Sequence, residues 1–237
     1  MRLSPLSTPR ASEELAGQLR AQIRSGELPV GSRLPSQRDL AADLSIGRQA
    51  VQEALALLEL EGYLEIRRGA QGGSFVCEPV EEASFWLARM RESREDIRDI
   101  FDFRIGVECQ TSMLAAERRS DADLVALREA IRELPGPGLQ ARERRWRFRE
   151  ADSRFHVALA VAAGSSRLQS AVRQSRAELF LPTDRLPYED AIAVTRAQHF
   201  DIYLAVADRD AAAAARAMTA HIEETREHMR RFIEGEL

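Results

Sequence analysis

Two short helical patterns joined by a three-residue turn constrain the fold of this chain more than any other feature. In the second pattern, residues 48–61, Val51, Ala54 and Leu58 recur at helical spacing and form one apolar stripe. The first pattern covers residues 37–44 and is followed by a turn that ends in glycine. The polar residues of the second helix point away from its apolar stripe. The pattern therefore predicts a helix-turn-helix whose second helix presents a polar outer face.

A further helix precedes this pair and a β-hairpin follows it. The preceding helix is predicted from Ser12, as its N-cap, to Gly26. Residues 63–68 alternate in polarity, and residues 74–77 return after a glycine-rich turn. Such a hairpin is a wing, and its glycines, among them Gly72, allow a close approach to a phosphate backbone.

The block GELPVGSRLPSQRDLAADLSIGRQAVQEALALLELEGYLEIRRGAQGGSFV, within residues 12–77, resembles the winged helix-turn-helix of GntR-family transcription regulators. The resemblance implies that Arg38 and Arg48 contact DNA and that the wing with Gly72 enters the minor groove. We place Gln49 and Gln52 on the DNA-facing side of the second helix. The family usually has arginine where this chain has Gln52, a side chain better suited to adenine, so we predict an operator that differs from the common family consensus. The alternative is that Arg38 and Arg48 are solvated surface charges.

The charge balance does not by itself indicate a nucleic-acid-binding protein. The chain has 34 basic residues, all of them arginine, against 38 acidic residues, and its formal net charge is −4. Residues 1–79 contain nine arginines and ten acidic residues, which gives a net charge of −1. Contact with DNA must therefore come from a local patch of arginines.

After residue 80 the periodicity is helical throughout, and the sequence predicts a bundle. The predicted fold class is mainly α, with an N-terminal winged helix-turn-helix and a small β-hairpin wing joined to an all-α C-terminal bundle. We assign residues 1–11 to a disordered tail, 12–79 to the DNA-binding domain and 80–237 to the helical domain. The predicted helices of the bundle are 85–91, 95–119, 121–134, 140–163, 165–180, 188–207 and 210–234.

Within the bundle, Asp152 and His156 lie one helical turn apart, a spacing at which two side chains can hold one metal ion. On a helical wheel His199 and His221 also face inward on two later helices. One aspartate and three histidines from three helices could therefore converge on a single ion. The alternative is that buried histidines simply hydrogen-bond to their neighbours. The fourth histidine, His228, lies two turns beyond His221 and is interpreted as structural.

Residues 80–237 resemble the FCD effector-binding domain of the FadR branch of the GntR family. Its pattern of Asp-x3-His, a later His and a last-helix His is matched by Asp152, His156, His199 and His221. The resemblance implies a bound divalent metal ion. Histidine-rich ligation favours zinc and also suits nickel, manganese, iron or cobalt. The family's R-x3-E pattern is matched by Arg104, which either pairs with Glu108 or contacts a carboxylate of the effector.

Together these features predict a metabolite-responsive transcription regulator that binds a double-stranded DNA operator as a homodimer. A small carboxylate bound at the metal site is expected to release repression. No apolar run approaches a membrane span and the first ten residues lack a hydrophobic signal core, so we expect a cytoplasmic protein with no membrane partner.

Two other functions fit parts of the sequence. One is a metal-dependent enzyme, a non-haem oxygenase or hydrolase, fused to a DNA-binding head. We disfavour it because we find no inward glutamate or other base placed beside the ligands. The other is a DNA-binding protein whose bundle serves only dimerisation.

Overall fold

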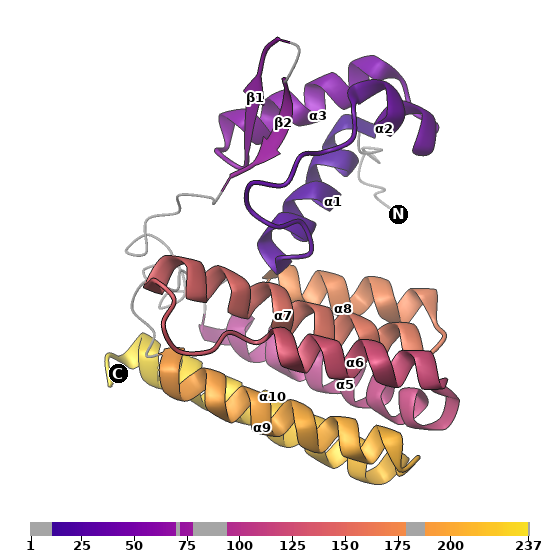
Figure 1. The fold of residues 1–237 in the computed structure, drawn as a ribbon, viewed down its shortest axis with the longest axis vertical. Coiled ribbons are helices and arrows are strands. Elements are labelled where there is room, and N and C mark those ends of the chain that lie inside the picture. The colour runs from indigo at the N-terminus through magenta and orange to yellow at the C-terminus, as the bar shows by residue number, and fades with distance from the viewer. Residues whose placement is uncertain (1–10, 70–71, 78–93, 179–187, 237) are drawn as a thin grey trace, which may run out of the picture. The chain divides into compact units, whose positions relative to one another are not determined.

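The computed structural model describes residues 11–69, 72–77, 94–178 and 188–236 (Figure 1). These residues form two compact units, one from residues 11–24 and 28–77, the other from residues 25–27 together with 94–178 and 188–236. The predicted helix at 85–91, the linker at 78–80 and residues 1–10 of the predicted tail lie outside the described residues.

The first unit contains three helices and a hairpin: α1 (Ala11–Ser25), α2 (Gln37–Asp43), α3 (Arg48–Leu60), β1 (Leu64–Arg67) and β2 (Gly73–Val76). The α1 helix already includes Ala11, so Ser12 lies inside its first turn and is not the N-cap. Ser36 caps α2, because its hydroxyl accepts a hydrogen bond from the Asp39 amide. The predicted apolar stripe of α3 is buried and forms a core with Ile23 of α1.

The wing is an antiparallel pair in which Leu64 lies opposite Val76 and Arg67 opposite Gly73. Gly72 stands where the chain enters β2, and a Cβ there would lie 2.4 Å from the Arg67 carbonyl oxygen. Only glycine fits such a close approach of two backbone segments. The Arg33 side chain donates a hydrogen bond to the Gly72 carbonyl, which ties the wing to the loop before α2.

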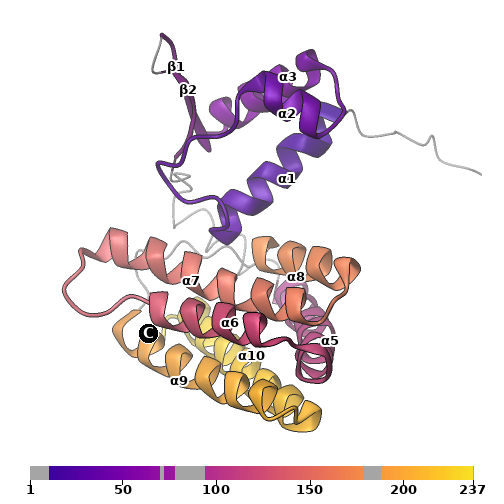
Figure 2. The ribbon, with the colours of Figure 1, turned by 45° about the vertical axis from the view of Figure 1, so that its right-hand side comes forward.

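The second unit is a helical bundle built from α5 (Arg94–Arg118), α6 (Asp121–Glu133), α7 (Ala141–Ala162), α8 (Ser166–Glu178), α9 (Tyr188–Ala207) and α10 (Ala211–Glu234). The helices α9 and α10 lie side by side in both views (Figures 1 and 2), and α10 also packs along α5. Their shared core includes Phe101, Phe155, Leu159, Ile202 and Met218, each at most 1% exposed.

The predicted fold class is confirmed: the described residues are mainly helical, with one two-stranded hairpin in the N-terminal unit. The predicted bounds of α6 to α10 agree with the structure to within two residues. Among the residues that the structure describes, none of the helices is long and apolar enough to cross a membrane.

Candidate metal centre

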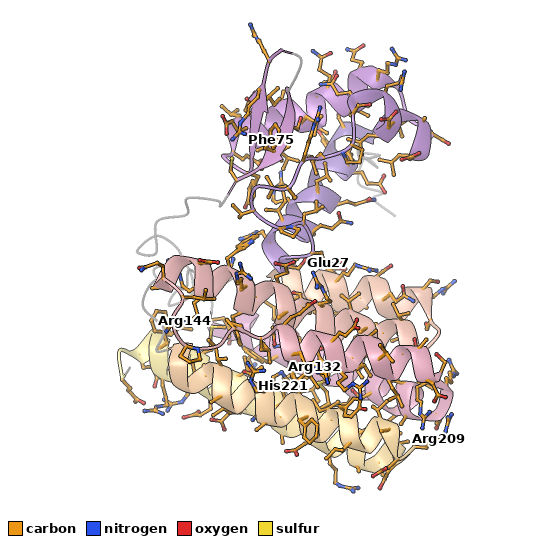
Figure 3. The ribbon with its side chains drawn as sticks, viewed as in Figure 1. Glu27, Phe75, Arg132, Arg144, Arg209 and His221 are labelled. Carbon is orange, nitrogen blue, oxygen red and sulfur yellow. The ribbon has the colours of Figure 1, made fainter. Side chains whose placement is uncertain are left out.

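Four side chains from three helices meet inside the bundle. Asp152 and His156 come from α7, His199 from α9 and His221 from α10, and one ligand atom of each lies within 4.8 Å of the others. Figure 3 labels His221 among the side chains of the bundle. The three histidines are 0 to 3% exposed, and the Asp152 side chain is 15% exposed. The structure thus brings together all four residues that the sequence singled out as metal ligands.

The carboxylate of Asp152 lies close to two of the three imidazoles. Its Oδ1 atom is 3.4 Å from Nε2 of His199 and 3.8 Å from Nε2 of His156. The three imidazole centroids are 4.9 to 5.2 Å apart. The His199 ring also stacks on Phe155 with 3.9 Å between centroids, which holds it in the core.

The donor atoms of this cluster fit a divalent metal ion. Among the described residues, neither ring nitrogen of His199 and neither ring nitrogen of His156 has a hydrogen bond of good geometry, although all four nitrogens are buried. Buried polar atoms are normally satisfied, so unpaired nitrogens beside a carboxylate indicate a missing partner. Three imidazole nitrogens and one carboxylate oxygen are a donor set that suits zinc and other first-row divalent ions.

The ionisation states also suit metal binding. Burial lowers the pKa of His156 to about 4, although the neighbouring Glu108 carboxylate opposes this effect. Burial lowers the pKa of His199, and burial together with the other two rings lowers that of His221 well below its ordinary value. The three imidazoles are therefore neutral at pH 7, the form in which their nitrogens bind a cation.

The acidic ligand remains ionised for a different reason. Burial alone would raise the pKa of Asp152, but the Arg176 guanidinium and the His199 side chain outweigh it, and the pKa lies well below its ordinary value. An Arg176 Nη atom donates to Oδ2 of Asp152, and its Nε donates to the Ser153 hydroxyl at 3.2 Å. Since Oδ2 is taken by arginine, Oδ1 is the oxygen that faces the histidines.

A second charged pair, Arg104 with Glu108, contacts the cluster at His156. Arg104 Nε donates to Oε1 of Glu108 at 2.7 Å, and these side chains are 3% and 1% exposed. The other carboxylate oxygen of Glu108 lies against Nδ1 of His156. Our expectation that no inward glutamate lies beside the ligands is therefore wrong: the helical spacing of Arg104 and Glu108 placed both on one face of α5, but it did not show which α7 residue that face meets.

Sequence reasoning missed two residues that contact the ligands. The first is Arg176, which lies on α8 one turn after Val172 and next to Ser175. Val172 and Ser175 are buried. The apolar Val172 one turn earlier was the sequence signal that could have shown that Arg176 faces the interior. Gln198 precedes His199 on α9, and its Oε1 lies 2.8 Å from Nδ1 of His221. The contact joins two neighbouring helices, so no spacing within one helix reveals it.

The residues expected to contact DNA belong to the first unit, and Gly72 of the wing is buried. Arg38, Arg48, Gln49 and Gln52 are exposed on α2 and α3. Arg38 is 76% exposed and lies 3.4 Å from Asp39, and Gln49 donates to Glu53 at 3.1 Å. These contacts are weak local pairs that a phosphate or base edge can replace at little cost.

Two family models match the chain. Residues 11–76 match the description "Bacterial regulatory proteins, gntR family", and residues 99–224 match the FCD domain. The chain is also 33% identical over 218 residues, 87% of its own length and 76% of the other, to RmpR of Mycobacterium gastri, named as an HTH-type transcriptional regulator. This chain belongs to the GntR family.

Two further comparisons agree with this family. The chain is 29% identical to an Escherichia coli (strain K12) protein, by its name a regulatory protein of the L-lactate dehydrogenase operon, over 96% of this chain and 89% of that one. The solved structure of E. coli McbR/YncC has the same fold, with a TM-score of 0.54 and 18% identity over 95% of this chain and all of that one.

The GntR-family chain is thus a transcription regulator with a DNA-binding helix-turn-helix and an FCD effector-binding domain. The GntR helix-turn-helix implies that its partner is operator DNA. The family and the named relatives are regulators of transcription, a class of protein that is not enzymatic.

Proposed function

We propose that Asp152, His156, His199 and His221 hold one divalent metal ion and that this ion forms the floor of a pocket for a small carboxylate effector. The observation that carries the proposal is the convergence of four ligand atoms within 4.8 Å of one another, where the ring nitrogens of His156 and His199 are buried without a hydrogen bond. Zinc is the ion we expect first, and nickel, manganese, iron and cobalt suit the same donors.

A bound divalent ion supplies positive charge and coordination positions to which a carboxylate can bind. The chain contributes two guanidinium groups close by, Arg104 at 3% and Arg176 at 9% exposure. We assign the direct contact with the effector to Arg104, whose planar fork can hold a carboxylate through paired hydrogen bonds. The E. coli relative named for an L-lactate dehydrogenase operon supports a small carboxylate as the effector class.

At the other end of the chain, residues 12–79 act as the DNA-binding domain and residues 80–237 as the effector-binding and dimerisation domain. A homodimer places two α3 helices in successive major grooves of a near-palindromic operator. Arg38 and Arg48 contact the DNA, Gln49 and Gln52 face the groove, and the wing with Gly72 enters the minor groove. The protein acts in the cytoplasm as a repressor, and the effector releases it from DNA.

The effector can release the operator only through a difference in its affinity for two states of the protein. It must bind the DNA-free state more tightly than the DNA-bound state, and the ratio of these affinities limits the response. A metal ion that coordinates the effector in one arrangement of α7, α9 and α10 supplies such a difference. Loss of a ligand therefore removes the response as well as the ion.

The experiment is elemental analysis of purified protein followed by a thermal-shift panel of small carboxylates. We expect about one metal ion per chain and a rise in the melting temperature with the effector, since a ligand that binds only the folded state stabilises it. His199→Ala should lose both the ion and the effector response. His228→Gln, which alters the one histidine outside the cluster, is the matched control and should retain both.

Two results contradict the proposal. If the purified protein contains no metal and responds to none of the acids, dimerisation is the remaining function for the bundle. A His199→Ala variant that loses the ion but keeps the full effector response would separate the metal from sensing. Turnover of a candidate acid by the metal-loaded protein would instead favour the enzymatic alternative.

A further inference from the structure

Two of the three histidines in the cluster have an outer contact at the ring nitrogen that faces away from its centre. Nδ1 of His156 lies against Oε2 of Glu108. Nδ1 of His221 lies 2.8 Å from Oε1 of Gln198. In the His156 ring it is Nε2 that lies 3.8 Å from Asp152 Oδ1, on the side opposite to the outer contact. Each of these two rings therefore has one nitrogen engaged outside the cluster.

The identity of the acceptors determines where the ring protons lie. A carboxylate can only accept a hydrogen bond at neutral pH, so Nδ1 of His156 must carry the proton; otherwise two lone pairs would face each other. Both atoms are buried and neither has another hydrogen-bond partner among the described residues, so each is the partner available to the other. An amide oxygen likewise accepts from Nδ1 of His221. In both rings Nε2 is then left with a lone pair for a metal ion.

We propose that Glu108 and Gln198 are positioning residues for the metal site, which fix the tautomer and orientation of His156 and His221 so that both present Nε2 to the ion. The inference rests on the proposed metal site. It names the side chains outside the ligand set that determine the affinity for the ion. It also gives Arg104 a role within the unliganded protein: its Nε holds Glu108 at 2.7 Å in the orientation that meets His156. Arg176 acts in the same way on Asp152, because it takes Oδ2 and leaves Oδ1 free.

His199 differs from the other two rings. No described residue accepts a hydrogen bond from its Nδ1, and its orientation comes from stacking on Phe155. Its Nε2 lies 3.4 Å from Oδ1 of Asp152, where a proton on Nε2 is attracted to the carboxylate. A metal ion held by Nε2 of this ring would require the proton to be carried by Nδ1 instead. The structure thus assigns two preset ligands and one that changes tautomer when the ion binds.

Nitrogen-15 NMR of the metal-free wild-type protein tests the tautomers directly, without any substitution. Imidazole nitrogens with and without a proton have widely separated chemical shifts, and each ring can be assigned by its correlations. We expect Nδ1–H with a bare Nε2 for His156 and His221, and Nε2–H for His199. A proton on Nε2 of both His156 and His221 would overturn the inference.

Zinc affinity, measured by competition with a chelating dye on the full chain, tests the consequence. Outer partners of metal-bound histidines typically contribute about 10- to 100-fold in affinity, and we expect a loss of this size in Glu108→Leu and in Gln198→Leu, since leucine offers no acceptor. Gln198→Glu should bind zinc at least as tightly as the wild type, because a carboxylate can only accept from Nδ1. If Gln198 merely filled space, zinc binding would not be weaker in Gln198→Leu than in Gln198→Glu.

The controls separate this inference from the metal site itself. Glu129→Leu makes the same change at an exposed position of α6 and should leave zinc affinity unchanged. Circular dichroism of the metal-free variants establishes that each one folds. Gln198 is only half-buried, so substitutions there are expected to disturb folding less than substitutions of Glu108. Wild-type protein that binds no zinc would overturn the site and the inference together. Wild-type binding with unchanged affinity in Glu108→Leu and Gln198→Leu would overturn the inference alone.

Discussion

Acidification should destabilise the metal-free helical unit by an amount that follows from the burial of its histidines. The pKa of His156 falls from its ordinary 6.5 to about 4 on folding, because burial disfavours the charged ring. Between these two values the unfolded chain binds a proton that the folded chain does not. Stability therefore falls as the pH is lowered, and it is retained above pH 6.5.

The size of the effect follows from the same two values. For His156 alone, lowering the pH from 7 to 5 should remove about 2 kcal/mol from the free energy of unfolding, and lowering it to 4 should remove about 3 kcal/mol. His199 and His221 add to the loss, since their pKa values are also lowered. Asp152 and Glu108, whose pKa values are lowered too, contribute in the same direction at more acidic pH.

The chain is well suited to this measurement. All four histidines lie after residue 80, and so do both tryptophans, Trp86 and Trp146. Urea unfolding of chelator-treated protein, followed by tryptophan fluorescence at pH 7, 6 and 5, therefore reports the part of the chain that contains the titrating groups. His156→Gln should lose about 2 kcal/mol less than the wild type between pH 7 and 5. An unfolding free energy that stays constant or increases on acidification would refute the reasoning.

Three further predictions concern the wing, the DNA-facing helix and the core. Gly72→Ala should lower DNA affinity, measured by gel shift on a selected operator, because the new Cβ would lie 2.4 Å from the Arg67 carbonyl oxygen; unchanged affinity would show that the wing shape is not required. Arg48→Ala should weaken binding and reduce the dependence of log affinity on log salt by about 1, whereas an unchanged salt slope would place Arg48 away from phosphate. Phe155→Ala should lower the free energy of unfolding in urea by about 3–5 kcal/mol, because Phe155 is fully buried. It should also weaken zinc binding, because His199 stacks on Phe155. A loss of stability below about 1 kcal/mol would contradict that packing.

The sequence by itself determined the elements of this protein. Apolar residues at helical spacing fixed the stripe of α3, and the alternation after Gly62 fixed the wing, because these periodicities depend on the backbone geometry of each element alone. The same local geometry placed Asp152 one turn from His156. The inward positions of His199 and His221 also followed from the apolar residues of their own helices.

Only the tertiary structure decided what these residues meet. Glu108 was visible as the partner of Arg104, but its second oxygen faces His156 on α7, and the angle between α5 and α7 is set by packing of the whole core. The contacts of Arg176 with Asp152 and of Gln198 with His221 likewise join two different helices. Spacing along one helix determines which face a side chain occupies, whereas the packed bundle determines which atom lies opposite it.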